Sequence, residues 1–283
     1  MVGVDLGGTW VRVLALSDGE RAARITTRAP RGCDLPRFLR RLWRQRRWHG
    51  RVAALVVAAR GVWTEHERAA VRARLRDLGQ HVRVISDAEA AWMAALDDGA
   101  GVLILAGTGS IVLGRTARGR WVRAGGLGPL LGDEGSAFWL GREWLRASRR
   151  DARALRALAT SSDPVARIAA HAPAVVARAR RGDRTALRIV RAAQDHLASL
   201  AATVAADVKL RAPVAVGGAG SVMRNPWFRE GVRRALARRG VRARWSRHTT
   251  EPVAAAARLA ARSVGTTAGS GRAATRRGIR SPA

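Results

Sequence analysis

The fold is decided by the stretch VLILAGTGSIVLGRTARGRWVRAGGLGPLLGDEGSAFWLG, which occupies residues 102–141. An apolar run at 102–106 is followed by a short polar segment and by a second apolar run at 111–113. This pattern predicts a strand, a tight turn and a second strand. The turn consists of Gly107, Thr108, Gly109 and Ser110. Because its glycines carry no side chain that would keep a phosphate away, the backbone N–H groups of the turn can bind one anion.

A similar hairpin is expected at the N-terminus, where the sequence DLGGTWVRVLAL covers residues 5–16. Its turn holds Gly7, Gly8 and Thr9, and apolar residues again alternate with polar ones on both sides. Two copies of one hairpin indicate two similar halves of the chain. Asp5 lies at the edge of the first turn. A carboxylate there either holds Mg²⁺ through water beside a nucleotide phosphate or is an ordinary turn aspartate.

The segments after the first hairpin alternate between helix and strand. Helices are expected at residues 35–48, 64–78 and 88–96, and strands at 52–59 and 82–85. Thr64 and Glu67 have the spacing of a capping box. This order predicts an α/β fold with parallel strands, whose carboxyl ends carry functional groups. Asp87 follows one of these ends, and its immediate neighbours favour a helix N-cap over a functional role.

The second half begins with two carboxylates, Asp133 and Glu134, which lie between glycines just before a helix expected near Ser136. Further helices extend to residue 208, and a strand at 214–216 leads into a third glycine-rich turn. This turn contains Gly217, Gly218, Ala219 and Gly220. Such glycines let the backbone approach a flat or charged ligand, and a plain strand-to-helix connection is the alternative.

A last helix is expected at residues 252–261. Residues 263–283 show neither periodicity nor core residues, so a disordered tail is expected there.

The composition excludes several classes of protein. Hydrophobic residues make up 47% of the chain, as in a globular protein, and no apolar run approaches the roughly 18 residues of a membrane span. The first residues lack a basic region followed by an apolar signal core, so a cytoplasmic location is expected. Cys33 is the only cysteine, which excludes an internal disulfide and a cluster held by several thiolates of one chain.

The formal net charge of +31 suggests nucleic acid as a partner, because clustered cations gain affinity for phosphate backbones. The cations are almost all arginine, however, and Lys209 is the only lysine. This one-sided usage favours arginines spread over solvated faces, so nucleic-acid binding is the disfavoured alternative.

Several catalytic motifs are missing from the sequence. It contains no G-x-x-x-x-G-K-[ST] loop and no G-x-S-x-G elbow, and its six histidines lack the spacing of metal ligands. What remains are the glycine turns and three placed carboxylates, which suit a nucleoside triphosphate.

These motifs resemble those of the N-acetylglucosamine kinase and BadF/BadG-type ATPase group of the actin and sugar kinase superfamily, over about residues 2–261. DLGGT resembles the first phosphate motif, AGTGS the second and VGGAGSV the adenosine motif, while SDAEAAW resembles the segment with the catalytic aspartate. GGLGPLLGDEGSAFWLG is the most specific match, because it resembles this group rather than the superfamily at large.

The resemblance implies an α/β fold of two ribonuclease-H-like (actin-like ATPase) domains with a nucleotide cleft between them. One domain would comprise residues 1–97 completed by the helix at 251–262, and the other residues 98–250 with a helical insertion. The implied activity is phosphorylation of a hydroxyl of an amino sugar, N-acetylglucosamine or glucosamine-like, with ATP and Mg²⁺. A homodimer is also implied.

The resemblance further assigns roles to individual residues. Asp87 would be the general base, and Asp5 would hold Mg²⁺ through water. Phosphate would contact Gly7, Gly8, Thr9, Gly107, Thr108, Gly109 and Ser110. Adenosine would contact Gly217, Gly218 and Gly220. The sugar would contact Asp133, Glu134, Gly126 and Arg60.

Two departures from the pattern concern the substrate. Relatives that bind N-acetylglucosamine carry S-L-S-G-G where this chain has AARGV at 58–62, and the loop at 28–34 offers no asparagine for the sugar. Arg60 therefore either points to solvent or faces the pocket, where it would favour an anionic substrate.

A third departure concerns a different activity of the group. Relatives that activate dehydratases through a bridging iron-sulfur cluster supply two cysteines per chain, and Cys33 alone disfavours that function. A kinase, a non-catalytic or regulatory ATP-binding protein and a basic nucleic-acid binder remain.

Overall fold

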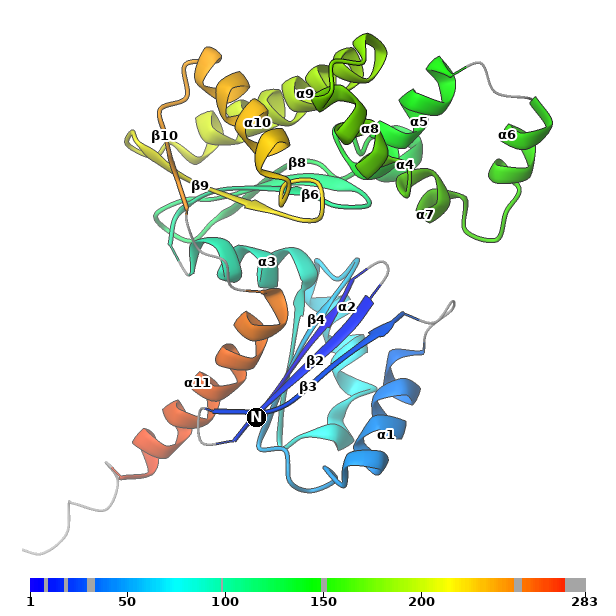
Figure 1. The fold of residues 1–283 in the computed structure, drawn as a ribbon. Coiled ribbons are helices and arrows are strands. Elements are labelled where there is room, and N and C mark those ends of the chain that lie inside the picture. The colour runs from blue at the N-terminus through cyan, green and yellow to red at the C-terminus, as the bar shows by residue number, and fades with distance from the viewer. Residues whose placement is uncertain are drawn as a thin grey trace, which may run out of the picture. The chain divides into compact units, whose positions relative to one another are not determined.

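The computed structural model describes residues 1–7, 10–17, 20–29, 34–97, 99–148, 152–246 and 251–272. The chain forms two compact units, Met1–Ala94 with Thr250–Ala283 and Ala95–Thr249. The division falls inside helix α3 (Asp87–Leu96). Each unit contains a five-stranded mixed sheet of its own (Figure 1).

The first unit is built on a sheet with the strand order β3-β2-β1-β4-β5. Its strands are β1 (Val2–Leu6), β2 (Trp10–Ser17), β3 (Glu20–Arg28), β4 (Ala54–Ala59) and β5 (His81–Ser86). β1 pairs with β2 antiparallel and with β4 parallel, and β4 pairs with β5 parallel. The predicted hairpin and the predicted parallel strands are therefore confirmed.

Helices cover both faces of this sheet. They are α1 (Leu35–Arg46), α2 (Glu65–Ala73), α3 and α11 (Pro252–Arg272), with a 3-10 helix at Arg76–Leu78. On one face Trp43 of α1 is fully buried, and its indole N–H donates to the Leu78 carbonyl at 2.8 Å. On the other face Ala256 and Ala260 of α11 pack against Val56. All six residues of β4 are buried, as expected of a strand that is covered on both sides.

One prediction for the first unit is confirmed and another is wrong in part. The capping box of Thr64 and Glu67 is confirmed, with the Glu67 N–H donating to the Thr64 hydroxyl at 3.2 Å. The disordered tail expected from residue 263 is wrong for its first part, because α11 continues to Arg272. The helix continues because Val264 packs against the core and the Ser263 hydroxyl donates to the Leu259 carbonyl at 3.0 Å. Residues 273–283 lie outside the described residues.

The second unit repeats the same sheet with the order β10-β9-β6-β7-β8. Its strands are β6 (Gly101–Ala106), β7 (Ser110–Arg115), β8 (Trp121–Gly125), β9 (Val214–Ala219) and β10 (Ala243–Trp245). β6 pairs with β7 antiparallel and with β9 parallel, as β1 pairs with β2 and β4. The two halves inferred from the repeated hairpin therefore share one strand order.

Seven helices are described in the second unit. They are α4 (Gly128–Leu131), α5 (Ala137–Ala147), α6 (Ala152–Ala159), α7 (Pro164–Ala169), α8 (Ala172–Arg180), α9 (Arg184–Val208) and α10 (Pro226–Arg238). The long α9 is the centre of the core, since Leu197, Ala201 and Val204 along it are fully buried. Among the described residues no helix is both long and apolar enough to cross a membrane.

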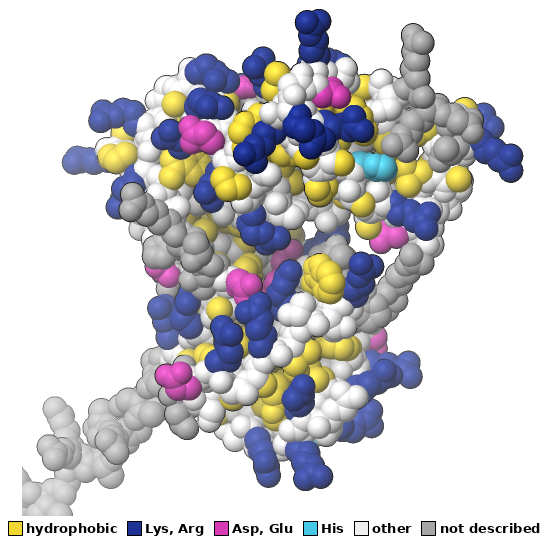
Figure 2. All heavy atoms as spheres, in the orientation of Figure 1, with side chains coloured by type: hydrophobic (Ala, Val, Ile, Leu, Met, Phe, Trp, Pro, Cys, Tyr) yellow, Lys and Arg dark blue, Asp and Glu magenta, His cyan; other side chains and the backbone are white. Residues whose placement is uncertain are grey.

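The surface carries arginines in many places. Figure 2 shows Lys and Arg side chains distributed over the visible face, with Asp and Glu side chains between them. Several of these arginines form ion pairs, for example Arg233 with Glu230 at 2.7 Å and Arg72 with Glu65 at 3.1 Å. On this visible face the distribution is that of solvated side chains rather than of one continuous basic groove.

Candidate active site

The carboxyl ends of three neighbouring strands bring the predicted groups of the first unit together. In the sheet register Leu6 of β1 lies beside Ala59 of β4, and Ala59 lies beside Ser86 of β5. The next residues along these strands are Gly7, Arg60 and Asp87, which therefore lie at one edge of the sheet. This is the edge at which open α/β sheets bind ligands.

Asp87 is not the N-cap of α3, so the interpretation favoured by its immediate neighbours is wrong. Ser86 caps the helix: its hydroxyl accepts from the Glu89 N–H at 3.0 Å, and the Glu89 carboxylate accepts from the Ser86 N–H at 2.7 Å. This reciprocal pair is a capping box, whose S-x-x-E signal stands in the sequence at 86–89. The Asp87 carboxylate is consequently not needed to begin the helix.

The half-buried Asp87 carboxylate has an unusual environment. Burial raises the pKa of this carboxyl above its ordinary range, while a hydrogen bond from the Ala88 N–H at 2.9 Å and the positive charge of Arg60 oppose that rise. A carboxylate with a raised pKa is a better proton acceptor than an ordinary aspartate. The environment of Asp87 is therefore compatible with the proton acceptance predicted for it.

Asp5 lies in β1, where its side chain is 5% exposed. Its carboxylate accepts from the guanidinium of Arg12, which lies opposite in β2, at 3.1 Å. Burial raises the pKa of Asp5, Arg12 lowers it, and the negative charges of Asp87 and Glu251 raise it further. Arg12 is a residue of this site that the sequence did not suggest, since nothing in the pattern showed which residue faces Asp5.

The first turn is described only in part. The Gly7 N–H donates to the Trp10 carbonyl at 3.0 Å, which closes the base of the turn. Gly8 and Thr9, which were predicted to contact phosphate, lie outside the described residues. Residues 30–33, part of the loop at 28–34 that contains no asparagine, also lie outside them.

In the second unit the turn at Gly107, Thr108 and Gly109 is fixed by its neighbours. The Gly107 N–H donates to the Gly109 carbonyl at 2.9 Å. The carbonyls of Gly107 and Thr108 accept from the first amides of α5, those of Ala137 at 2.8 Å and Phe138 at 3.1 Å. Within the described part of the chain, the N–H groups of Thr108 and Gly109 donate to no protein acceptor, so these two amides are available to an anion.

Asp133, predicted to contact the sugar, instead holds this turn. Its carboxylate is 7% exposed and accepts from the Ser110 N–H at 3.0 Å, and it lies directly against Gly109. The Ser110 hydroxyl donates to the backbone carbonyl of Glu134 at 2.8 Å, so the Ser110 side chain also has a partner within the protein. The half-buried Glu134 carboxylate remains the better placed of the two acids to bind a ligand.

The third glycine turn differs from the sequence interpretation, because β9 extends to Ala219 and includes Gly217 and Gly218. A side chain at Gly217 would meet Ala95 at 2.8 Å, so close packing requires this glycine. Gly220 has φ +93 and lies against the backbone of Ala106, which again requires glycine. Gly126 has φ +72 and lies against Ile111. These glycines thus have structural reasons of their own, and their contacts with adenosine or sugar stay predictions.

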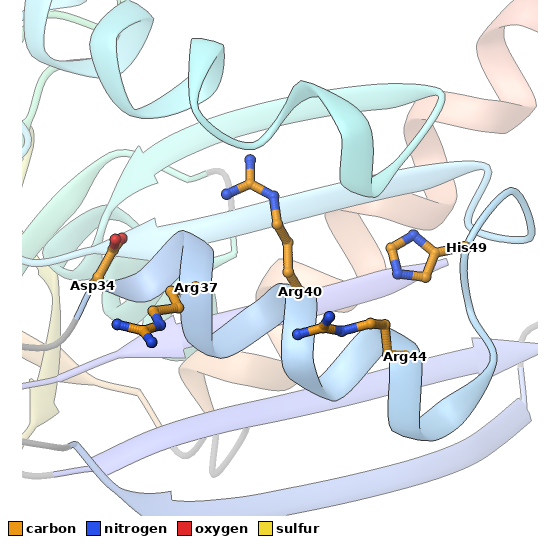
Figure 3. A pocket seen from close by; sticks show the side chains of 5 residues that line it. All are labelled: Asp34, Arg37, Arg40, Arg44 and His49. Carbon is orange, nitrogen blue, oxygen red and sulfur yellow. The ribbon is translucent and has the colours of Figure 1, made fainter.

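A hollow elsewhere on the first unit contains none of the predicted site residues. It has a volume of about 470 Å³ and is lined by Asp34, Arg37, Arg40, Arg44 and His49 on and beside α1 (Figure 3). Arg40 is held by Asp77 at 2.8 Å, and Asp34 by Arg74 at 2.9 Å. Both ion pairs are solvent-exposed, and we do not assign this hollow to the active site.

A comparison with known protein families shows to which of them the chain belongs. The sequence profile of the BadF/BadG/BcrA/BcrD ATPase family matches residues 2–259. The chain belongs to this family. The resemblance inferred from the motifs is therefore confirmed.

One curated relative is similar to part of this chain. The N-acetylmuramic acid/N-acetylglucosamine kinase of Clostridium acetobutylicum is 32% identical over 98 residues, which are 34% of this chain and 32% of that protein. The match thus spans about a third of the curated relative.

Solved structures show the fold. A Chromobacterium violaceum protein assigned as an N-acetylglucosamine kinase has a TM-score of 0.68 and 23% identity, over 91% of this chain and 97% of its own. The glucokinase of the ROK family from Streptomyces griseus, solved with glucose and AMPPNP, has a TM-score of 0.61 and 19% identity, over 93% of this chain and 99% of its own. The predicted fold of two actin-like ATPase domains is confirmed.

Proposed function

We propose that this protein is an ATP-dependent kinase that transfers a phosphoryl group to a hydroxyl of an amino sugar, N-acetylglucosamine or a glucosamine-like compound. Membership of the BadF/BadG/BcrA/BcrD ATPase family supports the use of ATP. The similarity to proteins named as sugar kinases supports a sugar as acceptor.

The observation that carries the proposal is the state of Asp87. Phosphoryl transfer needs an aligned hydroxyl, neutralisation of the phosphate oxygens and a group that accepts the hydroxyl proton. Asp87 stands at the carboxyl end of β5, is released from capping by Ser86, and has a raised pKa because it is buried. In our proposal its carboxylate accepts the proton as the sugar oxygen attacks the γ-phosphorus of ATP, and ADP leaves.

The phosphates of ATP would bind backbone amides of the glycine turn at 107–110. In the second unit these are the N–H groups of Thr108 and Gly109, held in place by α5 and by Asp133. Gly107 and Ser110 would shape that turn rather than donate to the ligand, because their amides already have acceptors. We assign sugar hydroxyls to Glu134, because its carboxylate has no partner among the described residues.

The family implies Mg²⁺, and the residues at Asp5 fit that ion in one way. Mg²⁺ keeps several waters and takes one or two carboxylates beside substrate phosphates. Asp5 supplies one such carboxylate, with one of its oxygens occupied by Arg12 at 3.1 Å. Bound there through water, the ion would neutralise charge on the phosphate oxygens. Arg12 would limit the excess negative charge of Asp5 and fix the orientation of its carboxylate.

One observation favours a non-catalytic, regulatory ATP-binding protein as the second candidate. Asp5 is already neutralised by Arg12, and this pair would serve a protein that binds a nucleotide without turning it over. A regulator would bind ATP with or without sugar, whereas a kinase would consume ATP faster when its sugar is present.

The test is ADP release with Mg²⁺ and ATP against a panel of amino sugars, in wild type, Asp87→Asn and the control Asp207→Asn. Asp207 is an exposed residue of α9, so its substitution makes the same chemical change outside the proposed site. We expect sugar-stimulated turnover that Asp87→Asn lowers by about 10² to 10⁴-fold, as for loss of a general base. Tight ATP binding without stimulation by any sugar would contradict a kinase and support the regulator.

A further inference from the structure

Arg60, whose positive charge acts on Asp87, has no hydrogen bond or ion pair among the residues that the structure describes. Three other carboxylates of the described part of this unit, Asp5, Glu89 and Glu251, each form an ion pair with an arginine. Their partners are Arg12, Arg68 and Arg24 respectively. Arg60 is exposed and forms no ion pair within the described part of the chain. Its guanidinium is therefore free to bind an anion from solution.

The sheet register sets where that anion would lie. Arg60 follows Ala59 directly, Asp87 follows Ser86 directly, and Ala59 and Ser86 are neighbours in parallel strands. The two side chains thus start from adjacent positions at the same strand ends. Because a hydroxyl must reach Asp87 to be deprotonated, Arg60 stands on the side of the phosphoryl acceptor.

We propose that Arg60 gives the site a preference for an amino sugar that carries a carboxylate over the same sugar without that charge. This inference rests on the proposed kinase function and names the substrate class of the same site. A guanidinium binds a carboxylate through two parallel N–H donors, a geometry that a serine cannot offer. The unpaired charge of Arg60 is suited to an acid and gains nothing from a neutral sugar.

The experiment compares acceptors that differ in one group. N-acetylmuramic acid, its methyl ester and N-acetylglucosamine share the hexosamine ring. The first two share the lactyl ether, and only the acid carries the charge. We would measure kcat and KM with ATP for each acceptor in wild type, Arg60→Ser, Arg60→Lys and Arg44→Ser. Arg44 lies in the hollow on α1, so its loss removes one positive charge from the same unit outside the site.

We expect wild type to prefer the acid over its ester by about tenfold in kcat/KM, the lower end for a charged hydrogen bond because Arg60 is exposed. Arg60→Ser should abolish this preference by raising KM for the acid alone. Arg60→Lys should retain part of it, and Arg44→Ser should leave it unchanged. An unaltered ratio of acid to ester in Arg60→Ser overturns the proposal. A higher KM for ATP with every acceptor also overturns it, because Arg60 would then bind phosphate.

Calorimetric binding of the same three compounds separates this inference from the proposed function. Binding that prefers the acid and depends on Arg60, without phosphoryl transfer, would support Arg60 as the selecting residue while contradicting the kinase. Binding of all three compounds with equal affinity, or of none, would contradict the selection by Arg60 whatever the turnover.

Discussion

Replacing Asp87 by asparagine should stabilise the protein while it removes the activity. The substitution keeps the size of the side chain and the oxygen that accepts from the Ala88 N–H at 2.9 Å. It removes only the charge. Since burial raises the pKa of Asp87, the charged carboxylate is less stable in the folded chain than in the unfolded one.

The sign of the pH dependence follows from this raised pKa. The folded state binds the Asp87 proton more tightly than the unfolded state, whose carboxyl has a pKa of about 3.9. The stabilisation by that proton is complete below the unfolded pKa and is lost as pH rises through the folded pKa. The stability gained by Asp87→Asn over wild type should therefore grow across this window and stay constant above it.

The size of the effect is set by the shift in pKa. Each unit by which burial raises the pKa corresponds to about 1.4 kcal/mol of unfolding free energy at neutral pH. About 1 kcal/mol raises the Tm of a domain of this general size by about 2–4 °C. The assay is thermal unfolding followed by circular dichroism from pH 4 to 8, with Asp207→Asn as the control. A Tm of Asp87→Asn equal to or below wild type at neutral pH would refute the reasoning.

Substitutions at three further positions test the packing and the glycine turn at 107–110. Asp133→Ala leaves the buried Ser110 N–H without its acceptor and should cost about 1–3 kcal/mol in urea unfolding, and Asp133→Asn, which keeps an acceptor, should cost less. A direct sugar contact of Asp133 would instead raise KM for the sugar in Asp133→Asn without loss of stability. Gly109→Ala places a methyl group 2.8 Å from the Asp133 carboxylate, so the turn at 107–110 must shift. We expect weaker ATP binding, measured by calorimetry. An unchanged ATP affinity would exclude this turn from the phosphate site. Gly3→Ala places a methyl group 2.7 Å from the Ala257 Cα in α11 and should lower the stability by about 1–3 kcal/mol in urea unfolding; a wild-type midpoint would show that α11 can shift freely.

The sequence predicted the strands that contain apolar runs and missed β3 and β8, two edge strands whose residues are mostly exposed or half-buried. β4 and β6 are apolar nearly throughout because helices or neighbouring strands cover them, so their runs stand out. β3 reads ERAARITTR and has no fully buried residue, so its composition does not differ from that of a surface loop. It is a strand because its backbone pairs with β2, a long-range interaction that local composition does not record.

The candidate site was predicted at the level of its turns and less well at the level of its side chains. The glycine turns identified the hairpins because each one interrupts two apolar runs, although Gly7, Gly107 and Gly109 do not have the positive φ that would require glycine. The partners of the acids depend on register. That Asp5 faces Arg12 follows from the length of the first turn, and that Asp133 reaches Ser110 follows from a loop that returns to the sheet. Of these side-chain contacts, only the capping box has a local sequence signal, the S-x-x-E pattern at 86–89. This capping box shows that Ser86, and not Asp87, caps helix α3.

The two hairpins differ in where their buried acids come from. The position before the turn that holds Asp5 in the first unit is Leu105 in the second. The first hairpin carries its acid within the strand, buried beside Arg12, where it can serve an ion. The second hairpin has no acid of its own and receives Asp133 from a later loop, and this carboxylate binds the Ser110 amide. Among the described residues, the acid of the first hairpin is therefore bound by a side chain opposite it in the sheet, whereas the acid beside the second hairpin holds the backbone of the turn itself.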